Sequence, residues 1–152
     1  MKILVAIDES QCSEATINGV ANYFKPQAAE LRILHVLTPI AFSPVPQISP
    51  AYAPELEEQA KQARALVEKY AEQLRTAGYK VDSVVETGDV CESIIDSATR
   101  WGANLIVLGS HGHKGIQRLL LGSVAYSVVR RATCSTLVFR LPANQQSVDT
   151  HA

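Results

Sequence analysis

Hydrophobic residues are concentrated in five short runs along the chain, and these predict five β-strands. The runs cover residues 2–8, 30–37, 79–86, 105–109 and 136–140. The fourth run is uninterrupted from Leu105 to Leu108, which is the mark of a strand buried on both faces of a parallel sheet.

Between these runs, apolar residues recur at helical spacing and predict four helices. The helices are expected at about residues 10–24, 54–78, 89–101 and 122–132. Either Ser10 or Ser13 can cap the first helix, and Pro26 stops it. The second helix carries one apolar face, formed by Leu56, Ala60, Ala63, Val67, Tyr70 and Leu74.

Two segments fall outside this alternation. Residues 38–54 contain five prolines, a density that predicts an irregular, functional or mobile loop. Residues 142–152 are polar and predict a disordered tail. The remainder, residues 1–141, has the length of one domain.

Strands that alternate with helices predict an α/β fold, an open parallel sheet with helices on both faces. Ligands of such sheets bind beyond the carboxyl ends of the strands, where the strand order reverses. Asp8 and Gly109 stand at the carboxyl ends of the first and fourth strands. We therefore expect these two residues to lie together at a binding site.

The fourth strand runs into a glycine loop and then into a helix, an arrangement that aims backbone N–H groups at phosphate. Gly109, Gly112 and Gly115 can take backbone angles closed to other residues and admit a ligand close to the main chain. Gly122-Ser123 lies at the start of the following helix. An ordinary glycine-containing loop is the alternative, but two glycine sites flanking one loop favour an anion site.

The spacing of these glycines excludes the two commonest phosphate motifs. Neither G-x-x-x-x-G-K-[ST] nor G-x-G-x-x-G is present. The loop matches G-x2-G-x9-G-[ST], formed by Gly109, Gly112, Gly122 and Ser123. In this pattern, and in its opening Ile3–Ser10 segment, the chain resembles the ATP-binding branch of the universal stress protein family.

The resemblance implies a single domain of the adenine nucleotide alpha hydrolase-like fold, with strand order 3-2-1-4-5. It also implies an ATP site with Mg or Mn, in which Asp8 is the metal-linked residue; AMP or a cyclic nucleotide is an alternative ligand. The implied nucleotide-binding residues are Ala6, Asp8, Val36, Leu108, Gly109, Gly112, Gly122, Ser123 and Val124. Finally, it implies a homodimer that pairs the 136–140 edge strands.

Composition restricts the partners and the compartment. The 152 residues carry a net charge of −1, which favours neither a nucleic-acid groove nor an anionic membrane surface. No apolar run approaches the roughly 20 residues of a membrane helix. The three cysteines are scattered, without a CxxC pair, and are typical of reduced thiols in a cytoplasmic protein.

Several residues have a structural interpretation beside the functional one. Asp8 either contacts the ligand or caps the next helix. His111 and His113 are too few for a structural zinc site, which favours a solvent-facing or phosphate-neighbouring role. Lys114 and Arg118 either neutralise phosphate or are solvated. His35 is expected to be a hydrogen-bonded core residue, and Trp101 is expected to pack in the core.

Three functions are compatible with these features. The favoured one is a cytosolic ATP-binding regulatory or stress-resistance protein in which nucleotide occupancy is the signal. A slow ATPase is the second, although the sequence shows no nucleophile–base pair and a fast enzyme is not expected. A dimeric adaptor with a vestigial pocket is the third, and the intact glycine–serine pattern argues against it.

Overall fold

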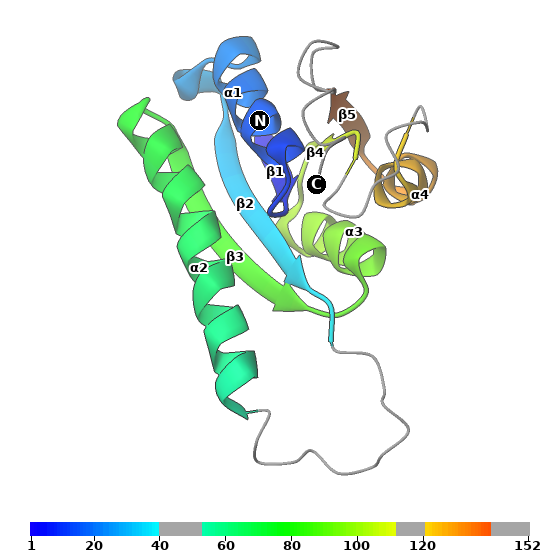
Figure 1. Cartoon of the computed structure of the whole chain (residues 1–152). Helices are drawn as coiled ribbons and strands as arrows, with labels where there is room; N and C mark the ends of the chain where they lie inside the picture. Colours follow the sequence, from blue (N-terminus) through cyan, green and yellow to red (C-terminus); the bar gives the residue numbers. More distant parts are fainter. Residues whose placement is uncertain (40–52, 112–120, 141–152) are drawn as a thin grey trace, which may run out of the picture.

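The centre of the molecule is a parallel β-sheet (Figure 1). The computed structural model describes residues 1–39, 53–111 and 121–140. In this part of the chain the sheet has five strands in the order β3-β2-β1-β4-β5, which confirms the predicted fold class and strand order. The strands are β1 (Lys2–Ile7), β2 (Glu30–Leu37), β3 (Lys80–Thr87), β4 (Leu105–Gly109) and β5 (Ser135–Phe139).

The central strands are buried on both faces, as their continuous apolar runs predict. Ile3 pairs with Leu31 of β2 and with Leu105 of β4, and successive residues of β1 keep this register. Ile3, Leu4 and Val5 are completely buried. Since neighbouring residues of a strand point to opposite faces, each face of the sheet must be covered by helices.

Two helices cover each face. One core cluster joins odd-numbered residues of β1 to α1 (Gln11–Tyr23) and α2 (Ala53–Thr76). The other joins Leu4, Leu34 and Ile106 to α3 (Val90–Trp101) and α4 (Ser123–Arg131). A short 3₁₀ turn, Pro26–Ala28, follows α1. Because the strands are parallel and each of these four helices follows a strand in the chain, the helices start at the edge of the sheet where the strands end.

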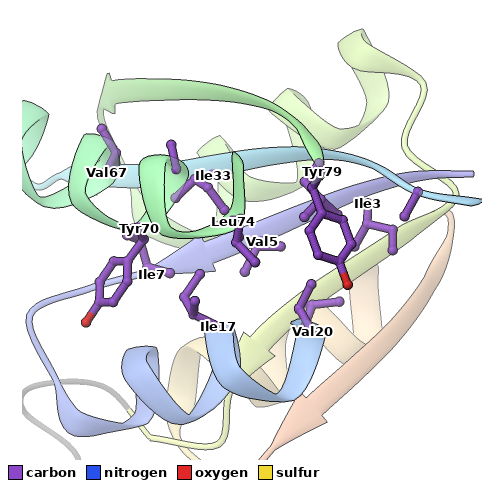
Figure 2. Close-up of a cluster of buried hydrophobic side chains, with 14 of the residues drawn as sticks. Ile3, Val5, Ile7, Ile17, Val20, Ile33, Val67, Tyr70, Leu74 and Tyr79 are labelled. Atoms are coloured by element: carbon purple, nitrogen blue, oxygen red, sulfur yellow. The ribbon is translucent and has the colours of Figure 1, made fainter. Parts of the chain in front are cut away.

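The core on the α1–α2 face is sealed by an aromatic side chain from the α2–β3 turn. Figure 2 shows the Tyr79 hydroxyl directed past Val20 toward α1. The hydroxyl donates to the carbonyl oxygen of Phe24, the residue that follows α1. Gly78, with φ of 94°, lets the chain turn here, as predicted for a glycine after a helix.

The predicted apolar face of α2 is only partly buried. Its members from Ala63 to Leu74 lie in the core, whereas the Leu56 side chain is 45% exposed. Figure 1 shows the reason, because the N-terminal end of α2 projects past the strands it packs on. Helical spacing alone does not reveal where the sheet under a helix ends.

Two aromatic side chains, Tyr23 and Phe139, pack together beside strand β5. The strand lies at the edge of the sheet beside β4. The Phe139 ring packs against Gly19 of α1, where a Cβ would overlap it, and contacts the Tyr23 ring edge-on with 5.6 Å between centroids. Tyr23 is 76% exposed, so an apolar surface flanks the free edge of the sheet.

Some predictions lie outside the described residues. These are most of the 38–54 loop, the disordered tail at 142–152, and the roles of Gly112, His113, Lys114, Gly115 and Arg118. A search of the described helices found none with the length and apolar character required to cross a membrane.

Candidate functional site

A cavity of about 370 Å³ opens at the carboxyl ends of the strands. One part of its wall is apolar and includes Leu34, Val36, Val90, Ile94, Leu108 and Val124. Another part is polar and includes Asp8, Ser13, His35, Ser110, His111 and Ser123. A cavity with both characters fits a ligand that has a flat apolar end and a charged end.

The structure brings the predicted site residues together. Asp8 and Gly109 both line this cavity, which confirms that the ends of β1 and β4 meet there. All but one of the residues implied by the resemblance line it as well: Ala6, Asp8, Val36, Leu108, Gly109, Gly122, Ser123 and Val124. Gly112 lies outside the described residues.

Asp8 is held by the start of α1. Its Oδ1 accepts hydrogen bonds from the Ser10 N–H at 3.0 Å, from the Ser10 hydroxyl, and from the Ser13 hydroxyl at 2.8 Å. Ser10 is the N-cap residue of α1, one of the two predicted alternatives, but it makes no side-chain cap, because its hydroxyl donates to the Asp8 carboxylate instead. The Asp8 carboxylate is therefore fixed in orientation at the cavity wall.

The helix starts around the cavity differ in how they are capped. Asp89 caps α3 by accepting the Glu92 N–H at 2.9 Å. The N-cap residue of α4 is Gly122, which has no side chain to offer, and Ser10 makes no side-chain cap on α1. The first backbone N–H groups of a helix need partners outside it and favour anions. The start of α4 is therefore the anion-attracting wall, whereas the start of α1 already holds the Asp8 carboxylate.

The two described glycines of the loop are required by packing rather than by unusual backbone angles. Neither has a positive φ. A Cβ at Gly109 would stand 2.7 Å from the Cys12 Cβ, and one at Gly122 would stand 3.0 Å from the Ser110 carbonyl oxygen. The interpretation of Gly109 as a residue with special backbone angles is wrong, because it is an extended residue of β4 that must approach α1.

Ser110 is a site residue that the sequence analysis missed. It is buried, with 2% of its surface exposed, and its hydroxyl oxygen lies 3.1 Å from Nδ1 of His111. Its backbone N–H donates to the Phe139 carbonyl at 2.7 Å, and its carbonyl accepts from the Gly122 N–H at 2.7 Å. A polar residue directly after an apolar strand was the available signal.

His35 is a core residue, as predicted. Its side chain is buried, and Nδ1 lies 2.9 Å from the Ile7 carbonyl oxygen. Because a carbonyl only accepts, Nδ1 carries the proton. The ring thereby ties the end of β2 to the end of β1 beneath the cavity.

Tyr70 of α2 lies close enough to Asp8 and Glu14 for their charges to affect its hydroxyl. Burial raises the pKa of its hydroxyl, and the negative charges of Glu14 and Asp8 raise it further. Figure 2 shows this hydroxyl pointing away from the apolar cluster. Tyr70 is therefore a neutral group near Asp8 at physiological pH.

The residues present fit a magnesium ion that is carried by a nucleotide. Within the described ranges no three histidine, cysteine or carboxylate side chains gather as a metal-ligand set. Mg²⁺ in nucleotide sites takes only one or two protein carboxylates, and the phosphates and water supply its other oxygens. Asp8 meets that requirement.

Comparison with known proteins decides the family. The model of the universal stress protein family matches residues 1–140. The chain belongs to this family. A universal stress protein of Bacillus subtilis, YxiE, is 31% identical over 145 residues, which cover 91% of this chain and 98% of the relative.

Solved structures agree with this assignment. The hypothetical protein MJ0577 superposes with a TM-score of 0.82 at 26% identity, covering 93% of this chain and 96% of that one. A universal stress protein family member from Arabidopsis thaliana with AMP bound has a TM-score of 0.72 at 16% identity. A universal stress protein in complex with cAMP has a TM-score of 0.68 at 22% identity. These last two show a shared fold.

Proposed function

We propose that this universal stress protein binds ATP with Mg²⁺ or Mn²⁺ in the cavity at the carboxyl ends of its strands, and that nucleotide occupancy regulates the surface it shows to partners. The observation that carries the proposal is the mixed character of that cavity. Apolar and polar residues both line it, together with the starts of two helices that have no side-chain caps.

The apolar part suits an adenine ring. Val36, Val90 and Ile94 offer flat hydrophobic contact without charge. The Leu37 carbonyl accepts from the Gly88 N–H on the β3 side. Since carbonyl groups alternate in direction along a strand, the Val36 carbonyl points the other way, past the last pair of β1 with β2 at Ile7 and His35. It would accept a hydrogen bond from an adenine amino group.

The polar part suits a phosphate chain. Ser123 and Val124 belong to the first turn of α4, where backbone N–H groups and the helix dipole favour negative charge. Asp8 lines the same cavity and would hold the divalent ion, which offsets the repulsion between the carboxylate and the phosphates. The ion would thus make the binding of a triphosphate compatible with Asp8.

Related folds support the choice of ligand class. The AMP and cAMP complexes show that proteins of this fold accommodate adenine nucleotides. For this chain, ATP is preferred over AMP or a cyclic nucleotide because the uncapped start of α4 and a divalent ion held by Asp8 would both favour a ligand with more negative charge.

Two further elements belong to the proposal. One is a homodimer formed by pairing of the 136–140 edge strand, because edge strands leave unpaired backbone groups and apolar side chains flank this one. The other is a cytoplasmic location, supported by Cys12, Cys91 and Cys134, all of which are free thiols.

The test begins with the nucleotide that the protein carries or accepts. The purified protein is denatured, and the released small molecules are identified by mass spectrometry. The emptied protein is then titrated calorimetrically with ATP, with and without Mg²⁺. We expect ATP in the extract and magnesium-dependent binding. An empty extract together with no heat on titration would contradict the proposal and favour an adaptor with a vestigial pocket.

A further inference from the structure

We propose that Ser110 positions the His111 imidazole so that the protein distinguishes adenine nucleotides by the charge of their phosphate groups. The inference rests on the proposed nucleotide site and assigns its specificity to a pair of residues that lie between Gly109 and Gly112 in the sequence rather than at the glycines themselves. Ser110 is the positioning residue, and His111 is the residue that meets the ligand.

Ser110 is fixed more firmly than a loop serine usually is. Its backbone N–H is bonded to the end of β5, and its carbonyl is bonded to the start of α4. Its side chain is buried and reaches Nδ1 of His111 at 3.1 Å. A hydroxyl attached to a backbone held on both sides is an effective group for orienting a neighbouring ring, because little freedom remains to be lost.

His111 is placed beside the anion-attracting wall. Its Cα lies 3.3 Å from the position that a Cβ on Gly122 would occupy, so its backbone packs directly on the N-cap of α4. The residue lines the same cavity as Ser123 and Val124. A phosphate held by the first turn of α4 is therefore a close neighbour of His111.

The hydrogen bond to Ser110 determines what the ring offers. When the Ser110 hydroxyl donates to Nδ1, the neutral ring carries its proton on Nε2 and is a donor there. When the ring is doubly protonated, it donates from both nitrogens and carries a positive charge. The ring can therefore donate a hydrogen bond to an anion in both states. Without the Ser110 hydroxyl, the neutral ring is no longer held in the form that carries its proton on Nε2.

The contribution of such a donor grows with the charge of the ligand. ATP carries more negative charge than AMP, and cyclic AMP carries less than either, so an oriented donor or cation stabilises ATP most. An apolar wall, by contrast, contacts the same adenine ring in all three. The pair Ser110–His111 therefore affects the ranking of the nucleotides more than their shared affinity.

The experiment compares the affinities of ATP, AMP and cyclic AMP in one set of variants by calorimetry. For His111→Ala and Ser110→Ala we expect a loss of about tenfold for ATP and less than about twofold for cyclic AMP. His111→Gln, which keeps a side-chain N–H donor, should retain part of the ATP preference. Ser110→Thr, which keeps the hydroxyl, should restore it.

A matched control and a spectroscopic readout separate positioning from packing. Ser97→Ala removes an equally buried hydroxyl from α3, away from the cavity, and should leave the ranking unchanged. Nitrogen-15 NMR of the histidine rings should show one tautomer of His111, protonated at Nε2, in the wild type and a mixture in Ser110→Ala. A merely structural role would not move this signal.

The outcomes are distinguishable. If the folded wild type binds none of the three nucleotides, both this inference and the proposed function are overturned. If the wild type binds them and the Ser110 and His111 variants lose affinity equally for all three, or lose none, the nucleotide site stands and the inference is wrong.

Discussion

The backbone N–H of Gly122 donates to the carbonyl oxygen of Ser110 over 2.7 Å, which fastens the start of α4 to the end of β4. The backbone N–H of Ser110 donates to the carbonyl oxygen of Phe139, the last residue of β5. One residue thus holds together an anion-attracting helix start and the edge strand of the sheet. A ligand that binds at the start of α4 therefore lies next to Gly122, whose hydrogen-bond partner Ser110 is bonded directly to the edge strand β5.

Gly122→Ala tests this close approach. A Cβ there would stand 3.0 Å from the Ser110 carbonyl oxygen, so we expect a destabilisation of about 1–3 kcal/mol from overpacking. Ser123→Ala, one residue on and exposed, is the control and should change the free energy of unfolding by less than about 0.5 kcal/mol. Urea denaturation followed by circular dichroism measures both. Equal urea midpoints for the two variants would show that the chain around Ser110 shifts to accommodate the added methyl group without loss of stability.

The fold was predictable because its signals are local. Uninterrupted apolar runs place the strands to within about one residue, and the glycine after α2 and the aspartate before α3 mark helix ends through backbone geometry and capping. Each of these depends on neighbours in sequence. The strand order came from the family resemblance, not from the runs.

The site was predictable only in part, because its geometry depends on contacts distant in sequence. That Gly109 must be small follows from Cys12, almost a hundred residues earlier, and no pattern around the glycine reveals it. The three attachments of Ser110 join it to β5, to α4 and to His111. Its sequence neighbourhood shows only a serine after a strand.

Asp8→Asn separates metal binding from the general shape of the cavity. The amide keeps a carbonyl oxygen that can accept from Ser13 but is a poorer ligand for a hard divalent ion. ATP affinity should fall about tenfold or more with Mg²⁺ present and much less in EDTA. Asp82→Asn, which removes a carboxylate paired with Arg32 in the sheet, is the matched control. Identical losses of ATP affinity with and without magnesium would show that Asp8 does not bind the metal ion.

Val138→Pro tests the edge-strand dimer. Proline lacks the N–H that a partner strand would need and adds a ring at the edge, so the dimer should dissociate. Val138→Ala keeps the N–H and should remain dimeric. Sedimentation velocity over a range of concentrations distinguishes the two. A proline variant that stays folded and dimeric would place the interface on another surface.

Tyr79→Phe examines the link between β3 and α1. The hydroxyl donates to the Phe24 carbonyl, and its loss should cost about 1 kcal/mol. Burial raises the pKa of Tyr79 above its usual value near 10, so its contribution is full below pH 10 and is lost as the pH rises through the higher folded-state value. The stability of the variant should fall less steeply in that alkaline range. Parallel pH profiles would assign the alkaline loss to other groups.

The last prediction is that ATP turnover is slow or absent. Rapid phosphoryl transfer needs an oriented water and cations that neutralise developing charge. Among the described residues that line the cavity there is no lysine or arginine, which leaves the divalent ion as the cation this wall would hold. His111 has a partner in Ser110, but the tautomer proposed above makes Nε2 a donor, and orienting a water for attack requires an acceptor.

Binding of this kind stabilises the bound nucleotide and the transition state alike, and therefore gives affinity without rate. A single-turnover assay with labelled ATP decides the matter. We expect a rate well below about 1 per second, the lower end of ordinary enzyme turnover. Hydrolysis at or above that rate, lost in His111→Ala but kept in Ser97→Ala, would make the protein an ATPase. The bound nucleotide would then be a substrate, and its occupancy would report turnover instead of regulatory state.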